Sequence, residues 1–245
     1  MDRSLALWRR ALSEGLATFF LVLAGCGAIV ADQRFGGLGP VGVAMTFGLV
    51  VAAMVSATGH LSGAHLNPAV TVAFALTRHF PARSTGAYVA AQLLGATAGA
   101  LVLLAAWPAA PADLGATRPS VGPGAALLYE GLLTAVLMFV IVAVATDVRA
   151  VGSAAALAIG GTVALDALFG GPVSGASMNP ARSLGPALAA GEWRDLWIYF
   201  VGPLAGAALG AFAYQLVRGE VPRPVTAAHP EGSRTDGQGP VRLPA

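Results

Sequence analysis

Long apolar runs separated by short polar segments dominate the chain. Each of six runs holds about 20 mostly apolar residues, which is enough for a helix to cross the hydrocarbon core of a bilayer. The pattern therefore predicts an all-α membrane protein with transmembrane helices at Ala11–Ala31, Pro40–Thr58, Ser84–Trp107, Gly124–Thr146, Val151–Gly170 and Leu196–Val217.

Two further apolar runs, Pro68–Leu76 and Pro180–Ala189, are too short to span a bilayer. Runs of this length are typical of re-entrant segments, interfacial helices or ordinary loops. Each run follows an asparagine, and Asn before Pro favours a helix start, because Asn caps the helix and Pro loses no needed hydrogen bond at its first position. The sequence thus predicts half-length helices that begin after Asn67 and Asn179.

The two halves of the chain resemble each other, which indicates an internal repeat. Three matches occur in the same order, at offsets of 116, 112 and 111 residues: Glu14–Thr18 with Glu130–Thr134, Ser62–Ala69 with Ser174–Ala181, and Gly95 and Gly99 with Gly206 and Gly210. Because each half carries three spans, an odd number, the second half must be inverted relative to the first. We expect one domain over residues 1–217, with repeats at about residues 10–107 and 124–217.

Composition supports a membrane protein and excludes several other classes. Only 11% of the 245 residues are charged and 56% are hydrophobic, whereas roughly a quarter of an ordinary soluble domain is charged. The net charge of +2 leaves no basic field for nucleic acid. The single cysteine, Cys26, excludes a disulfide framework and a multi-cysteine metal site. We expect no metal and no cofactor.

The arginines predict the orientation, because short loops that carry positive charge stay on the cytoplasmic side. Ten of the 14 lie on the side that holds both termini, against Arg34, Arg118, Arg182 and Arg194 on the other. Both termini are therefore expected to be cytoplasmic, in a plasma (inner) membrane of bacterial type. Residues 218–245 are rich in Pro, Gly and polar residues and lack an apolar face, so we expect a disordered tail.

Half-helices that enter from opposite faces are expected to meet head to head near the bilayer midplane. Non-helical backbone at that depth survives only where it lines a wet cavity or is buried in protein, so residues 59–66 and 171–178 should line a pore with their carbonyl groups. Two helix amino termini aimed at one point repel cations and protons, while the asparagine amides can donate to a passing molecule. The residues expected at this point are Asn67, Pro68, Ala69, Asn179, Pro180 and Ala181.

Charged and titratable residues inside the apolar segments are functional candidates, because a charge in a membrane is costly. Arg182 lies one turn into the second half-helix, where we expect it to donate at an outer constriction and repel cations. Glu14 and Glu130 either form a proton relay or accept backbone N–H groups from the broken segment of their own half, and we favour the second role. His60 and His65 are expected to line or support the pore rather than bind a metal.

The two Asn-Pro-Ala boxes, the arginine after the second box and the paired Glu-Gly-Leu-x-Thr stretches resemble the major intrinsic protein family, the aquaporins and aquaglyceroporins. The resemblance covers nearly all of residues 10–217. It implies a channel of six helices and two half-helices, embedded in the lipid bilayer as a homotetramer with one pore per subunit. It implies passage of water and small neutral solutes, and no enzymatic activity.

In this family the selectivity constriction takes four residues, and the resemblance assigns them to Phe47, Ala167, Ala176 and Arg182. Strict water channels usually carry His where this chain has Ala167, so the opening should be wider. The segment 171–187 resembles the nodulin-like branch and its bacterial relatives, which implies water together with solutes such as glycerol or metalloid hydroxides, for example boric or arsenous acid.

Other positions resemble the water channels more than the glycerol facilitators. Ser183 stands where glycerol facilitators usually carry Asp, and Tyr199–Phe200 stand where they usually carry Pro-Leu. Asp166 stands where the nodulin-like branch usually has Asn, and it lies either against another helix or at the pore mouth.

Two other classes of protein are open to test. Ser174 with His60 or His65 could be the dyad of an intramembrane serine protease, but that pairing leaves the duplicated boxes unexplained. An ion-coupled secondary transporter also fits an inverted repeat. Accumulation against a gradient would distinguish it from a passive channel.

Overall fold

The computed structural model describes residues 5–107, 113–147, 149–150 and 154–219, and these form eight helices and no strand. Six helices are long and apolar enough to cross a membrane: α1 (Leu7–Phe35), α2 (Gly39–Ser62), α4 (Ala82–Ala106), α5 (Pro123–Thr146), α6 (Ala155–Ser174) and α8 (Ile198–Arg218). Two short helices, α3 (Pro68–Leu76) and α7 (Pro180–Ala190), complete the fold. The six predicted spans and the all-α class are confirmed.

The ends of the helices differ from the predicted ones. Helices α2 and α6 each run one turn further, to Ser62 and Ser174, so the non-helical segments are residues 63–66 and 175–178 rather than 59–66 and 171–178. Both helices end at a glycine with a left-handed backbone, Gly63 (φ 97°) and Gly175 (φ 90°). A glycine in this conformation commonly ends a helix. Each helix therefore continues through the turn before its glycine and stops there.

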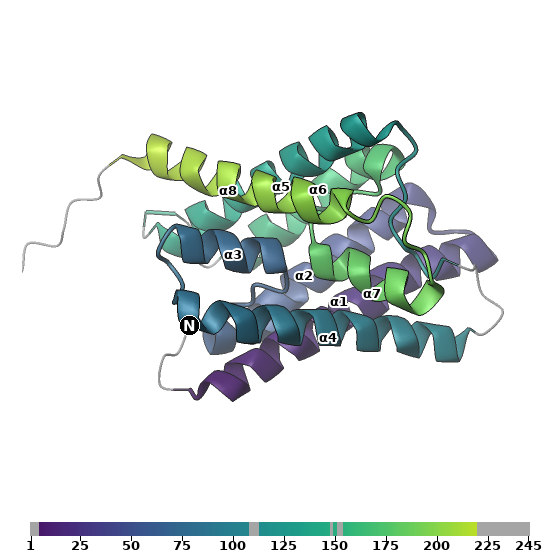
Figure 1. Ribbon diagram of the computed structural model, residues 1–245, viewed down its shortest axis with the longest axis horizontal. Coiled ribbons are helices and arrows are strands. Elements are labelled where there is room, and N and C mark those ends of the chain that lie inside the picture. Colours follow the sequence, from purple (N-terminus) through teal and green to yellow (C-terminus); the bar gives the residue numbers. More distant parts are fainter. Residues whose placement is uncertain (1–4, 108–112, 148, 151–153, 220–245) are drawn as a thin grey trace, which may run out of the picture.

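Some expected features fall on residues that the structure does not describe. The predicted start of the fifth span, Val151, is one of them. The predicted tail, residues 218–245, is described only at Arg218 and Gly219. Figure 1 shows that the beginning of α1 and the end of α8 lie at the same end of the molecule's long axis.

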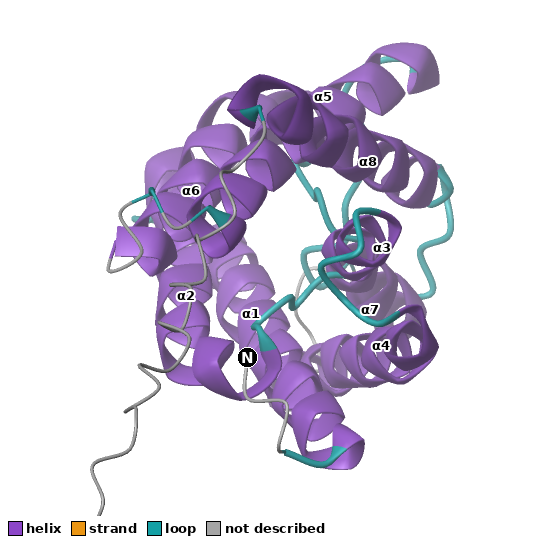
Figure 2. Ribbon diagram, turned by 90° about the vertical axis from the view of Figure 1, so that its left-hand side faces the viewer, coloured by secondary structure: helices purple, strands orange, loops and turns teal. Residues whose placement is uncertain are grey.

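Equivalent helices of the two halves pack in equivalent ways. Helix α1 packs against α4, α5 packs against α8, and α2 and α6 bring the two halves together. The short helices α3 and α7 lie inside this arrangement, as the view along the long axis in Figure 2 shows. Each contacts α4 and α8, and the two also contact each other.

Glycines allow the paired helices to cross closely. A Cβ atom at Gly95 of α4 would stand 2.0 Å from the carbonyl oxygen of Gly15 on α1. The equivalent Gly206 of α8 would bring a Cβ to within 2.1 Å of the Gly131 oxygen on α5. Small residues at such crossings let helix backbones approach in lipid. The matched glycines of the two repeats therefore serve equivalent helix crossings within the subunit.

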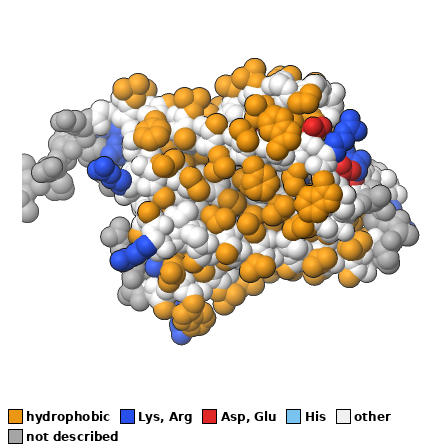
Figure 3. All heavy atoms as spheres, viewed as in Figure 1, with side chains coloured by type: hydrophobic (Ala, Val, Ile, Leu, Met, Phe, Trp, Pro, Cys, Tyr) orange, Lys and Arg blue, Asp and Glu red, His pale blue; other side chains and the backbone are white. Residues whose placement is uncertain are grey.

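The outer surface matches a membrane-embedded protein. Figure 3 shows hydrophobic side chains over the middle of one face, with charged side chains gathered at the two ends. Exposed tryptophans lie toward the ends of the spans: Trp8 at the start of α1, and Trp193 and Trp197 just before α8. Tryptophan is enriched at both membrane–water interfaces, so these residues mark the two boundaries of the apolar band.

Candidate functional site

The amino termini of α3 and α7 meet in the interior through two reciprocal hydrogen bonds. Asn67 donates from Nδ2 to the carbonyl oxygen of Met178 at 2.7 Å, and Asn179 donates from Nδ2 to the carbonyl oxygen of Leu66 at 2.9 Å. Both asparagine side chains are buried. Each half of the molecule therefore holds the asparagine of the other half.

The same asparagines start the two short helices. The Oδ1 atom of Asn67 accepts from the backbone N–H of Ala69 at 2.8 Å, and the Oδ1 atom of Asn179 accepts from Ala181 at 3.0 Å. Pro68 and Pro180 occupy the first helical positions. These are the cap contacts that the Asn-Pro pattern predicts. A primary amide has two N–H donors, so each Nδ2 keeps one N–H beyond its bond to the other half.

The segments before these helices have a backbone that non-glycine residues rarely adopt. Ala64 (φ 48°), Leu66 (φ 55°), Ala176 (φ 42°) and Met178 (φ 53°) all lie in the left-handed region. Such residues persist only where the surrounding structure fixes them.

Two buried glutamates supply that support. Glu14 accepts from the backbone N–H groups of His65 at 2.9 Å and Leu66 at 2.7 Å. Glu130 accepts in the same way from Ser177 at 2.9 Å and Met178 at 2.7 Å. Each carboxylate thus bonds the broken segment of its own half, which is the geometry of the supporting role and not that of a proton relay.

Sequence reasoning missed three further supports. Tyr88 donates to the carbonyl oxygen of Ser62 at 2.8 Å, and Tyr199 donates to that of Ser174 at 2.5 Å. The two tyrosines are 111 residues apart, the same offset as the glycine matches, so a longer comparison of the halves could have found them. Gln92 donates to Glu14 at 2.9 Å and has no counterpart among the hydrogen bonds that the described residues give Glu130.

A continuous cavity of about 500 Å³ runs beside the two short helices. One wall is apolar and includes side chains from four spanning helices: Leu21, Val51, Val55, Leu137, Ile141, Ile159 and Val163. The other wall includes the broken segments and both asparagines. Within the described part of the chain, the carbonyl oxygens of residues 63–65 and 175–177 accept no hydrogen bond. All of these residues except Gly175 line the cavity, so this wall offers free acceptors beside the N–H donors of the two asparagines.

The four residues expected at the constriction, Phe47, Ala167, Ala176 and Arg182, all line this cavity. The guanidinium of Arg182 lies over the Phe47 ring, 5.0 Å from its centroid. Arg182 also donates from Nη1 to the carbonyl oxygen of Gly115 at 2.8 Å. These residues, which come from α2, α6, α7 and the segment before α7, therefore line one cavity, and two of them, Phe47 and Arg182, are in direct contact.

The loop that holds Arg182 is tied to α7 and to the loop after it. Thr117 donates to Ser183 at 2.8 Å, and Ser183 bonds Ser177 at 2.5 Å, so a chain of hydroxyl groups lies beside the constriction. Arg118 forms ion pairs with Glu192 and with Asp113. The carbonyl partner of Arg182 thus belongs to a loop fixed at several points.

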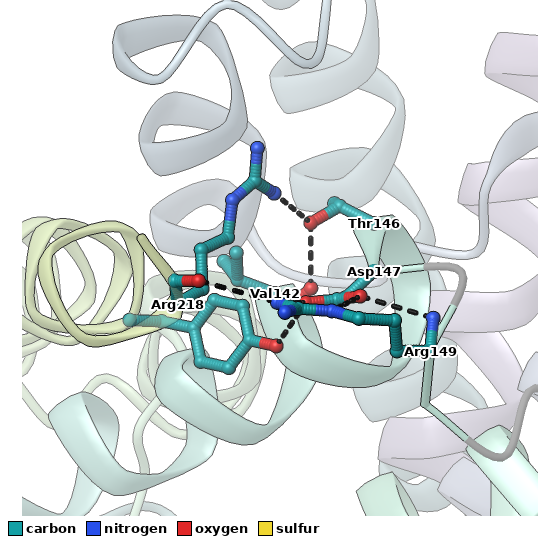
Figure 4. Close-up of polar contacts among 6 residues, drawn as sticks. Val142, Thr146, Asp147, Arg149 and Arg218 are labelled. Carbon is teal, nitrogen blue, oxygen red and sulfur yellow. Dashed lines mark hydrogen bonds and ion pairs between the residues drawn. The ribbon is translucent and has the colours of Figure 1, made fainter. Parts of the chain in front are cut away.

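At the opposite end of the cavity lies a polar cluster where α5 and α8 end. Figure 4 shows Asp147 and Arg149 beside Arg218 and Thr146. Arg149 donates to both carboxylate oxygens of Asp147, at 2.9 and 2.6 Å, and holds the pKa of that carboxyl well below its ordinary value. Arg218 donates to Thr146 at 3.4 Å, and Thr146 lines the cavity. His79 lines the same mouth, and burial together with the charge of Arg218 lowers its pKa.

Not all expected residues line the cavity. Pro68, Ala69, Pro180 and Ala181 are buried in the first turns of α3 and α7 and are not among its lining residues. His65 does line it, and its Nδ1 lies 3.1 Å from the Thr71 hydroxyl.

His60 does not have the position expected of it. Its side chain is exposed on the last turn of α2, because the helix extends through this residue. Within the part of the chain that the structure describes, the side chain forms no hydrogen bond with the broken segment. His60 therefore neither lines the cavity nor supports that segment.

Asp166 is buried on α6 beside Ala167. It does not line the cavity, and neither of its carboxylate oxygens has a hydrogen-bond partner among the described residues. Of the two placements expected for it, the structure supports the one against another helix.

The geometry does not support a serine protease. Ser174 donates to Glu130 at 2.7 Å, and the ring of His65 bonds Thr71. Neither residue is paired with the other. No group of three potential metal ligands occurs among the described residues.

An inverted repeat with two half-helices that meet beside a continuous cavity defines a membrane channel for small molecules. The chain matches the family described as major intrinsic protein over residues 1–214. The protein belongs to that family. It is therefore a multi-pass membrane channel and not an enzyme.

Comparisons with individual proteins agree. The chain is 51% identical to "Aquaporin NIP1-4" of Oryza sativa subsp. japonica over 218 residues, which cover 89% of this chain and 80% of that protein. It is 44% identical to "Nodulin-26" of Glycine max over 216 residues, 88% of this chain and 80% of the relative. The crystal structure of the aquaglyceroporin from Plasmodium falciparum superposes with a TM-score of 0.72 at 28% identity, covering 85% of this chain and 94% of that one.

Proposed function

We propose that the protein conducts water together with small uncharged solutes, such as glycerol, boric acid or arsenous acid, and excludes ions and protons. The reciprocal bonds between Asn67 and Asn179 and the opposite halves carry this proposal. They put two helix amino termini at one point of a cavity in which free carbonyl acceptors and the asparagine N–H donors share one wall. The similarity to proteins named aquaporin and to a solved aquaglyceroporin supports the same solute classes.

Exclusion of protons follows from the polarity at the asparagines. A helix amino terminus carries roughly half a positive charge, so the ends of α3 and α7 together oppose a cation. Each asparagine has an N–H left to donate to the oxygen of a passing water molecule. Water held in this way cannot also accept a proton from its neighbour, which interrupts the proton wire.

The choice of solute rests on the constriction. Phe47 and Arg182 give it an apolar face and a cationic donor, while Ala167 and Ala176 add little volume. A neutral molecule with hydroxyl groups can bond the guanidinium and rest its carbon atoms on the ring. A cation is repelled, because Arg182 forms no ion pair among the described residues.

The setting in the cell belongs to the same proposal. We place the channel in the plasma (inner) membrane as a homotetramer with one pore per subunit, and both termini in the cytoplasm. Helix ends near the described termini carry Arg9, Arg10 and Arg218, as the orientation rule expects of a cytoplasmic side.

Stopped-flow light scattering on proteoliposomes tests this function. We expect rapid shrinkage in a hyperosmotic impermeant sugar, followed in glycerol or boric acid by re-swelling that protein-free liposomes lack. A trapped pH dye should report no added proton leak. Shrinkage without re-swelling would restrict the channel to water, and the absence of any protein-dependent change would overturn the channel itself. Accumulation of solute driven by an ion gradient would favour the coupled transporter.

A further inference from the structure

The Phe47 ring lies directly against the bare backbone of a glycine on α1. A Cβ atom placed on Gly25 would stand 2.2 Å from Cε1 of the ring, 2.5 Å from Cδ1 and 2.6 Å from Cζ. Non-bonded carbon atoms pack at about 3.5–4.0 Å, so the ring occupies the volume that any side chain at position 25 would need. Gly25 is buried inside a regular helix and its φ is not left-handed, so no backbone requirement accounts for a glycine here.

The ring also meets Arg182. The guanidinium lies 5.0 Å from the ring centroid, and both residues line the cavity. The ring thus contacts both the α1 backbone and a cation that lines the same cavity.

The loop that holds Arg182 also packs against α1. Gly115, whose carbonyl oxygen accepts from Arg182, lies against Cys26, the residue after Gly25, since a Cβ at Gly115 would stand 3.2 Å from the Cys26 Cβ. Neighbouring residues of one helix therefore support both sides of the constriction, Gly25 behind Phe47 and Cys26 behind the loop that holds Arg182. Volume added at position 25 therefore displaces the Phe47 ring, which lines the passage.

We propose that Gly25 is a positioning residue that sets the width of the constriction through the Phe47 ring, and so sets the size of solute that passes. The proposal rests on the proposed function, because it assumes that Phe47 and Arg182 bound the narrowest part of the pore. It adds a residue that does not contact the solute and is not one of the four at the constriction.

The test measures glycerol and water permeability for Gly25→Ala in proteoliposomes. We expect the ratio of glycerol to water permeability to fall about tenfold, which corresponds to about 1.4 kcal/mol of added barrier for the larger solute. The matched control is Gly27→Ala on the same helix, whose Cβ would meet only the flexible end of Leu103, at 3.3 Å. Its ratio should equal that of the wild type.

A second background separates the ring from general damage to α1. In Phe47→Leu protein the smaller side chain leaves room at position 25, so adding Gly25→Ala should change the permeability ratio by less than about twofold. Independent effects would instead repeat the fall of about tenfold in this background. An unchanged ratio in Gly25→Ala, or an equal fall in both backgrounds, would overturn the proposal. So would failure of the double variant to insert and fold.

The wild-type measurements distinguish this inference from the proposed function. Wild type that passes water but no glycerol, urea or boric acid would overturn the proposed solute range alone. The inference would then be read from water permeability, which Gly25→Ala should lower and Gly27→Ala should not. Wild type that passes no water either would overturn both.

Discussion

Ala167 offers a test of whether a single side chain decides the solute range. It lines the same cavity as Phe47 and Arg182, and its methyl group leaves space that a larger residue would fill. We predict that Ala167→His lowers glycerol permeability about tenfold, an added barrier of about 1.4 kcal/mol, while water still passes. The imidazole would narrow the opening and compete for the guanidinium's hydrogen-bond partners. Stopped-flow re-swelling measures this, and an unchanged glycerol rate would remove Ala167 from the constriction.

Asp166 is expected to lower the stability of the folded protein, and the described residues show no interaction that offsets this loss. Both of its carboxylate oxygens are buried without a partner in the described structure. Leaving a buried polar group unpaired costs about 1–3 kcal/mol. We predict that Asp166→Leu raises the stability of the detergent-solubilised protein by an amount in this range, with a smaller gain for Asp166→Asn. Thermal unfolding measures both changes. A loss of stability in Asp166→Leu would indicate that the carboxyl has a partner in the native assembly.

At the scale of helices, the close crossing of α1 and α4 depends on Gly95. A methyl group there would meet the Gly15 carbonyl oxygen at 2.0 Å. Overpacking of this kind costs about 1–3 kcal/mol, so we predict that Gly95→Ala lowers thermal stability. Gly86→Ala, on the same helix with open space around it, is the matched control and should be neutral or slightly stabilising. Equal effects of the two substitutions would show that α1 and α4 can move apart at little cost.

The helices themselves were largely predictable from the sequence, for local reasons. Asn67–Pro68 and Asn179–Pro180 specify a cap and a first turn within two residues, so α3 was predicted at both ends and α7 at its start. The spans followed from apolar length alone. The last turns of α2 and α6 were missed, because their stop depends on the left-handed backbone of Gly63 and Gly175. A chain with 32 glycines does not indicate which of them adopt it.

Site residues could be predicted from the sequence where the same side chain occurs in both repeats. They could not be predicted where the contact is made by a backbone group. Glu14 and Glu130 stood out as paired acids in apolar runs. The partner of Arg182 is the carbonyl oxygen of Gly115, which any residue would provide, so no sequence pattern could indicate it. Gly25 likewise matters through the side chain it lacks.

At the scale of the whole molecule, the orientation in the membrane can be tested directly. Cys26 is the one cysteine of the chain and is fully buried, which leaves a clean background for labelling. Arg83 lies in the first turn of α4 at one end of the molecule, and Gly122 lies just before α5 at the other end. Both residues are exposed. We predict that a membrane-impermeant maleimide labels Gly122→Cys in intact cells and labels Arg83→Cys only after permeabilisation. The reverse pattern would place the termini outside.

The crossed amide bonds between the halves make the two repeats depend on each other. Taken alone, one repeat has an asparagine amide without its carbonyl acceptor and a carbonyl oxygen without its amide donor. A single repeat could therefore complete this junction only with a second, inverted repeat, so the fold of each half is finished by the other.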